Sequence, residues 1–143
     1  MRFRVGFTLS IALLIAQGCV SPRDPMGHRD ALKDAQKRYT DLIRWHDTER
    51  AVEYVDPELR EKFLAHAADL ETLEISDYEL GQIEYADDDT TAHVQVTYRG
   101  YSLTQFVERK IHVTQEWHRI SGNDWRVHPE IDTVVAQLRG TPR

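Results

Sequence analysis

The segment Trp45-His46-Asp47 places an indole, an imidazole and a carboxylate next to an apolar surface. His46 follows Leu42 by four residues, so the two share one face of a helix. A histidine that faces a cavity can act as an acid or a base near neutral pH. A histidine at a helix end is instead satisfied by a backbone carbonyl and by the negative end of the helix dipole. Because the sequence identifies no catalytic partner, we favour the second interpretation.

Four other histidines fall in segments with the pattern of β-strands: His93, His112, His118 and His128. Alternation places the first three opposite the apolar side chains of their strands. His112 and His118 are six residues apart, about 20 Å along a strand, which is too far to share an ion. Zinc sites usually show closer spacings. We therefore predict a solvated outer face with no metal and no other cofactor, and a cross-strand cluster is the alternative.

Large aromatic residues supply the remaining candidates for a binding site. No serine nucleophile elbow, phosphate-binding loop, dinucleotide glycine pattern or metalloprotease helix is present in the sequence. We therefore assign no catalytic residue, and an enzyme is the less favoured class. The residues that we expect to line a pocket are Tyr39, Trp45, His46, Tyr98 and Trp117.

The N-terminus has the pattern of a targeting segment. Arg2 and Arg4 precede an apolar stretch over residues 5–16, which is the length of a signal-peptide core and too short to span a bilayer. The stretch ends at Cys19, the single cysteine of the chain, so no intrachain disulfide and no multi-cysteine zinc site can form. An ordinary secretory signal followed by a free thiol is one interpretation.

The residues Ile15-Ala16-Gln17-Gly18-Cys19 resemble the lipobox of bacterial lipoproteins. The resemblance implies that a signal peptide over residues 1–18 is cut after Gly18. It also implies that the thiol of Cys19 carries a diacylglyceryl group and that the new amino terminus is acylated, for example with palmitate. Two or more chains give stable membrane anchoring. Val20 stands where an aspartate favours inner-membrane retention in enteric lipoproteins. The resemblance therefore implies an outer-membrane lipoprotein that faces the periplasm.

Cleavage would remove 18 of the 143 residues and leave a mature chain of 125. The loss of two arginines and no acidic residue would lower the formal net charge from -6 to -8. An acidic chain of this kind is a poor binder of nucleic acid and of anionic lipid surfaces. Its length suffices for one domain with its own hydrophobic core.

The sequence of the mature chain predicts a tether, followed by helices and then by strands. Residues 19–29 comprise Cys19 and a segment with two prolines and a glycine, which indicates a tether. Apolar residues at three and four residue steps predict one domain over residues 30–138, which begins with a helix of about four turns. Asp47 and Asp56 are expected to cap two further helical segments, which end near Glu71.

Four strands of an antiparallel meander are predicted in the second half, with a helical turn after them. The first, over residues 73–85, changes phase twice, which indicates bulges. The others are expected near residues 92–99, 106–120 and 125–128, with Val107 facing inward. Residues 131–138 form the helical turn, and residues 139–143 are expected to fray.

This order of elements, with the stretch YTDLIRWHDTERAVEYVDPELREKF, resembles small proteobacterial lipoproteins of the NTF2-like (SnoaL-like, cystatin-related) class. The resemblance implies an α+β fold in which N-terminal helices pack on a curved four-stranded antiparallel sheet to form a cone. This fold is typical of isomerases, dehydratases and hydrolases and also of non-catalytic binding domains, so the resemblance does not decide the function.

We expect a lipid-anchored periplasmic protein with a non-catalytic binding or accessory role in the cell envelope. Its partner would be an envelope protein or a small apolar ligand. The alternative is an enzyme of the SnoaL or isomerase-dehydratase type that acts on a small apolar substrate in the cone. Dimerisation through the outer sheet face is compatible with either function.

Overall fold

The computed structural model describes residues 24–140. The predicted signal peptide, the cleavage site at Gly18, the predicted acylation site at Cys19 and the rest of the predicted tether up to residue 23 lie outside the described residues. Within the described part, no helix is both long enough and apolar enough to cross a bilayer. The helical elements are α1 (His28–Arg44), α2 (Thr48–Ala51), η1 (Val52–Tyr54), η2 (Pro57–Leu59), α3 (Arg60–Leu70) and α4 (Ile131–Arg139). The strands are β1 (Leu73–Tyr85), β2 (Thr91–Ser102), β3 (Arg109–Ser121) and β4 (Asp124–His128).

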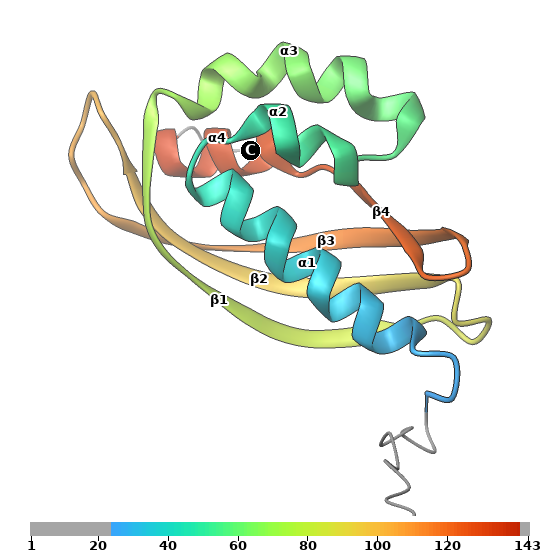
Figure 1. The fold of residues 1–143 in the computed structure, drawn as a ribbon. Coiled ribbons are helices and arrows are strands. Elements are labelled where there is room, and N and C mark those ends of the chain that lie inside the picture. The colour runs from blue at the N-terminus through green and yellow to red at the C-terminus, as the bar shows by residue number, and fades with distance from the viewer. Residues whose placement is uncertain (1–23, 141–143) are drawn as a thin grey trace, which may run out of the picture.

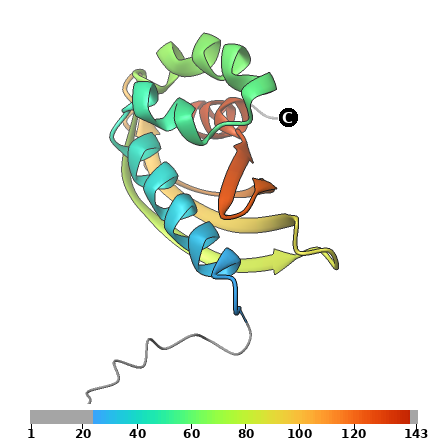
Figure 2. The same cartoon turned by 45° about the vertical axis from the view of Figure 1, so that its right-hand side comes forward.

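The strands form one antiparallel sheet in the order β1-β2-β3-β4. Helix α1 runs along the sheet, and α2, α3 and α4 lie together at one end of it (Figure 1). The curvature of the sheet is visible in Figure 2. The predicted arrangement, with helices packed on a curved four-stranded sheet, is confirmed.

Two bulges interrupt β1, where the sequence changes phase. The register shifts between Ile75 and Asp77 and again between Leu80 and Ile83. Each extra residue increases the local bend of a strand, so both bulges contribute to the curvature of the sheet. Alternation in β2 and β3 then directs every second side chain into the space under the helices.

The predicted caps are present, and one unexpected cap extends the first helix. The carboxylate of Asp47 accepts a hydrogen bond from the backbone N–H of Arg50, and that of Asp56 accepts one from Glu58. Helix α1 begins at His28, two residues before the predicted start. The carboxylate of Asp24 accepts the backbone N–H groups of the first turn, which would otherwise lack partners.

The prediction that β3 begins near residue 106 is wrong, because the segment before Arg109 forms a turn. The Ser102 carbonyl accepts the backbone N–H groups of Gln105 and Phe106, and Phe106 adopts a left-handed conformation with φ 53°. This turn takes the chain out of the sheet. Val107 is therefore exposed and does not face the core.

The hydrophobic core fills the space between the sheet and the helices. The amphipathic face of α1 and the even-numbered residues of β2 supply much of it. The largest fully buried side chains are Trp117, Tyr39, Tyr98, Phe63, Leu32 and Ile43.

Candidate functional site

A hydrogen-bonded polar cluster lies inside the core, under the helices. Gln115 occupies an inward position of β3, and its amide nitrogen donates to the Glu130 carboxyl at 2.8 Å. The Tyr98 hydroxyl donates to the same carboxyl oxygen at 3.3 Å. The indole N–H of Trp117 donates to the Gln115 carbonyl oxygen at 3.1 Å, and Thr40 lies 3.4 Å from the Gln115 amide. We call these five residues the interior cluster.

Glu130 is the titratable group of the interior cluster. It is the N-cap residue of α4, and its backbone carbonyl accepts the N–H of Val134. Burial raises the pKa of its carboxyl to about 7, although hydrogen bonds from Gln115 and Tyr98 act in the opposite direction. One carboxyl oxygen, Oε2, has no hydrogen-bond partner among residues 24–140. A carboxyl with this pKa can hold or release a proton near neutral pH.

Two tyrosines beside Glu130 are neutral over the physiological pH range. Burial and the nearby Glu130 carboxyl raise the pKa of Tyr98 and that of Tyr39. The ring of Tyr39 packs edge-on against Trp117, with 5.8 Å between the ring centroids. The hydroxyl of Tyr39 has no hydrogen-bond partner in the described part of the chain.

The interior is filled by these side chains. Tyr39, Tyr98, Gln115 and Trp117 are each 0% exposed, and Glu130 is 8% exposed. A side chain with no exposed surface borders no space in which a water molecule fits. The Glu130 carboxyl can therefore hold a proton in this interior. A ligand could reach the cluster only if the helices moved away from the sheet.

The five predicted pocket residues occupy two different places. Tyr39, Tyr98 and Trp117 lie in the filled interior. Trp45 and His46 lie beyond the last turn of α1, outside the core. Tyr98 and Trp117 thus belong to the interior cluster and Tyr39 packs beside it, whereas Trp45 and His46 lie at the end of α1.

His46 ends α1 in a Schellman motif. Its backbone N–H donates to the Ile43 carbonyl and that of Asp47 donates to the Leu42 carbonyl, while His46 adopts φ 57°. Glycine is the usual residue at such a position. The imidazole Nε2 is buried without a hydrogen-bond partner among the described residues. The backbone, not the ring, makes the hydrogen bonds at this helix end.

A groove of about 400 Å³ lies beside the end of α1. Its most prominent side chain is Trp45, which is 71% exposed and carries the Arg44 guanidinium over its ring at 5.0 Å. The Asp41 carboxylate at the groove accepts a hydrogen bond from the Tyr78 hydroxyl at 2.5 Å. The lining residues are Arg38, Asp41, Leu42, Trp45, Asp47, Arg50, Glu53 and Tyr54, and we call this surface the Trp45 groove.

Sequence reasoning missed the polar members of the interior cluster. Gln115 had a detectable signal, because it lies between Val113 and Trp117 on the inward side of β3. A polar residue at an apolar position of a strand indicates a buried hydrogen-bonding role. Glu130 follows Pro129 in a connection between β4 and α4, where no periodic pattern places its side chain.

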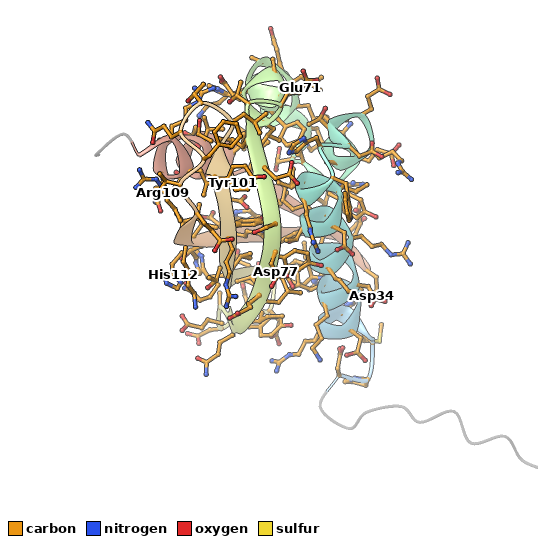
Figure 3. The ribbon with its side chains drawn as sticks, turned by 90° about the vertical axis from the view of Figure 1, so that its left-hand side faces the viewer. Asp34, Glu71, Asp77, Tyr101, Arg109 and His112 are labelled. Carbon is orange, nitrogen blue, oxygen red and sulfur yellow. The ribbon has the colours of Figure 1, made fainter. Side chains whose placement is uncertain are left out.

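The strand histidines lie on the outer side of the sheet. In Figure 3 the labelled side chains of His112 and Tyr101 lie on the side of the sheet away from α1, the helix that carries the labelled Asp34. His93 and His112 are exposed, as predicted. His118 and His128 come together across β3 and β4, with 4.3 Å between their ring centroids. A cross-strand cluster of histidines, the alternative left open by the sequence, is therefore present in the structure.

No protein-family model matches the sequence, and no curated protein matches it. Solved structures do match its fold. A SEC-C motif containing protein from Rhodopseudomonas palustris matches with a TM-score of 0.55 and 14% identity, over 66% of this chain and 73% of that one. A proposed polyketide cyclase from Xanthomonas campestris pv. campestris matches with a TM-score of 0.52 and 9% identity, over 78% and 99%. A ketosteroid isomerase-like protein from Erwinia carotovora atroseptica matches with a TM-score of 0.50 and 13% identity, over 68% and 88%.

The fold is NTF2-like. The predicted α+β fold class, with helices that cover a curved four-stranded antiparallel sheet, is thereby confirmed. At these identities the likeness concerns the fold alone. The fold is compatible with the enzyme alternative, and the choice between functions rests on this chain's own residues.

Proposed function

We propose that this protein is a lipid-anchored lipoprotein of the cell envelope that binds a protein partner at the Trp45 groove and catalyses no reaction in its interior. The N-terminal pattern that ends at Cys19 supports the anchor. The contrast between a filled interior and a tryptophan that is 71% exposed beside a groove carries the binding function.

The composition of the Trp45 groove suits a protein segment. Leu42, Trp45 and Tyr54 supply apolar surface, and Asp47 and Arg50 at its edge are joined by a hydrogen bond of 2.6 Å. Tryptophan is enriched among the residues that dominate protein interfaces, and charged residues are typical of their rims. The expected partner segment carries an apolar anchor side chain with charged neighbours.

The position of the Trp45 groove also supports this function. The predicted tether enters α1 at its first turn, and the groove lies beside its last two turns. Helix α1 has 17 residues, which corresponds to a length of about 25 Å. A domain held by the tether could therefore present the groove at the end that is remote from its attachment.

Crosslinking in native membranes tests this function. We would compare the intact chain with the variants Trp45→Ala and Leu64→Ala, the second of which removes an exposed apolar side chain of α3 outside the groove. The proposal expects one protein that crosslinks to the intact chain and to Leu64→Ala, and is lost from Trp45→Ala. Equal recovery of this protein with Trp45→Ala would contradict the proposal.

The enzyme alternative rests on Glu130. A carboxyl with a pKa of about 7 beside a tyrosine hydroxyl is suited to acid-base chemistry. This alternative requires an opening that admits a small apolar substrate to the interior. Titration of the chain with apolar compounds, followed through the indole N–H resonance of Trp117, would detect such an opening. A saturable shift of that resonance would show that the interior admits a small apolar molecule, as the enzyme alternative requires, and its absence would count against that alternative.

A further inference from the structure

Three side chains that can bind a metal converge on the outer face of the sheet. Glu116 and His118 belong to β3, and His128 lies directly opposite Glu116 on β4. One ligand atom from each lies within 4.8 Å of the others. The outer face thus brings together two imidazoles and a carboxylate that the proposed function does not use.

The separations between the ligand atoms suit one small cation. The Glu116 Oε1 atom lies 2.6 Å from Nε2 of His118 and 3.6 Å from Nδ1 of His128. In a tetrahedral zinc site with bonds of about 2.0 Å, ligand atoms are about 3.3 Å apart. The observed separations lie on either side of that value, so small rotations of exposed side chains would complete the geometry.

The outward nitrogen of each imidazole faces an oxygen atom of the protein. Nδ1 of His118 lies 3.5 Å from the Thr91 hydroxyl, and Nε2 of His128 lies 3.8 Å from a carboxylate oxygen of Asp56. Metal-binding histidines usually place their second nitrogen against such an oxygen, which fixes the tautomer and the ring orientation. Both rings therefore direct the correct nitrogen toward Glu116.

The backbone places Asp56 at this position. Its N–H donates to the Val127 carbonyl, next to His128, and Val55 forms an isolated parallel bridge with Val127. One oxygen of the Asp56 carboxylate caps η2 through Glu58, and the other faces His128. The partner of His128 is thus held by contacts that do not depend on a metal.

We propose that Glu116, His118 and His128 bind one divalent transition-metal ion of the class represented by Zn²⁺, with Asp56 and Thr91 as orienting residues. Imidazole nitrogen and carboxylate oxygen are common ligands for this ion. The site is on the face of the sheet that points to solvent, so the remaining coordination position is open to water. His93 is the cross-strand neighbour of Glu116 on β2.

Titration of the full chain with Zn²⁺ tests the site. The chain would be purified in detergent without a histidine tag, freed of metal with EDTA, and titrated by calorimetry. We expect one ion per chain and a higher melting temperature with Zn²⁺. Co²⁺ in place of Zn²⁺ should give the visible absorption of a four-coordinate ion.

Matched variants locate the ion. His128→Asn and Glu116→Gln should each lower the affinity for Zn²⁺ at least tenfold, and Asp56→Asn should lower it about tenfold because it weakens the orientation of His128. His112→Asn removes a histidine on the outer face of β3 that is not one of the three proposed ligands. This variant should bind Zn²⁺ as the intact chain does. Circular dichroism and unfolding curves would establish that each variant is folded.

Three results would overturn the proposal. The first is undetectable binding of Zn²⁺ to the folded intact chain. The second is unchanged affinity in a folded His118→Asn, His128→Asn double variant, which would indicate adventitious binding elsewhere. The third is one ion per two chains, which would place the ion between molecules.

Discussion

The amide nitrogen of Gln115 donates a 2.8 Å hydrogen bond to the Glu130 carboxyl in the filled interior between the sheet and the helices. This contact joins an inward position of β3 to the N-cap residue of α4 and so fixes the C-terminal helix against the sheet. It also supplies one partner to a carboxyl that has been removed from water. A buried polar contact of this kind constrains the packing around it, because each member costs stability when its partner is lost.

The Glu130→Gln variant should alter how stability depends on pH. The pKa of Glu130 is about 7 in the folded protein and near 4.5 in the unfolded chain. The stability that the protonated Glu130 carboxyl contributes to the folded protein is therefore fully present below pH 4.5 and is lost as pH rises through about 7. The loss corresponds to roughly 3 kcal/mol.

Urea unfolding between pH 5 and pH 8.5 measures this effect. The intact chain should lose stability across the range, whereas Glu130→Gln should lose much less and be the more stable protein at pH 8.5. Glu71→Gln changes an exposed carboxyl and should follow the intact chain. Identical pH slopes for the intact chain and Glu130→Gln would rule out a raised pKa at this position.

The Gln115→Leu variant should be strongly destabilised. It would leave the Trp117 indole N–H without its acceptor in a filled interior, and the Glu130 carboxyl would keep only the hydrogen bond from Tyr98. We expect a loss of about 2–4 kcal/mol in the free energy of unfolding. The control is Gln95→Leu on the outer face of β2, which should change it by less than about 1 kcal/mol. Similar losses for both variants would contradict a special role of the interior amide.

The Gly100→Ala variant should destabilise the pairing of β1 with β2. A Cβ atom at Gly100 would lie 2.3 Å from the Glu74 carbonyl oxygen and 3.2 Å from the Ile75 Cα. Both are backbone atoms, so the strands would have to separate, at a cost of about 2–3 kcal/mol.

Gly122→Ala provides the matched comparison for Gly100→Ala. Gly122 lies in the hairpin between β3 and β4 with φ +48°, and a Cβ atom there would contact nothing within 4 Å. Its cost should be only the backbone strain, about 1 kcal/mol. Thermal unfolding of the two variants should therefore give clearly different midpoints. A milder effect at Gly100 than at Gly122 would contradict the close approach of the strands.

The Trp45→Ala variant should leave the fold intact. Because Trp45 is 71% exposed and lies beyond the last turn of α1, its removal should change the free energy of unfolding by at most about 0.5 kcal/mol. Unfolding curves of the intact chain and the variant measure this directly. A large loss of stability would show that the indole is part of the packing and not a free binding surface.

Local patterns in the sequence predicted most of the fold. The two bulges of β1 followed from its changes of phase, and the caps at Asp47 and Asp56 followed from residue type and position. The start of β3 could not be predicted, because the left-handed turn at Phe106 is stabilised by hydrogen bonds to the Ser102 carbonyl and not by a turn residue such as glycine. Local propensity does not detect a turn of this kind.

The candidate sites were harder to predict because they depend on pairing between distant segments. Gln115 and Glu130 meet only when α4 folds back onto β3. His118 and His128 come together through the register of β3 with β4, which the spacing of residues along one strand cannot reveal. The spacing of four residues from Leu42 places His46 on the apolar face of the first helix, whereas the Schellman motif ends that helix before it.

Site-specific photocrosslinking in the native membrane tests the proposed binding function most directly. A photoreactive amino acid would replace Trp45 in one version of the intact chain and Leu64 in another, since both side chains are exposed but only the first lines the groove. We expect a single dominant crosslinked protein from position 45 that is absent from position 64. The same crosslinked proteins at both positions, or none at position 45, would contradict the proposed binding function.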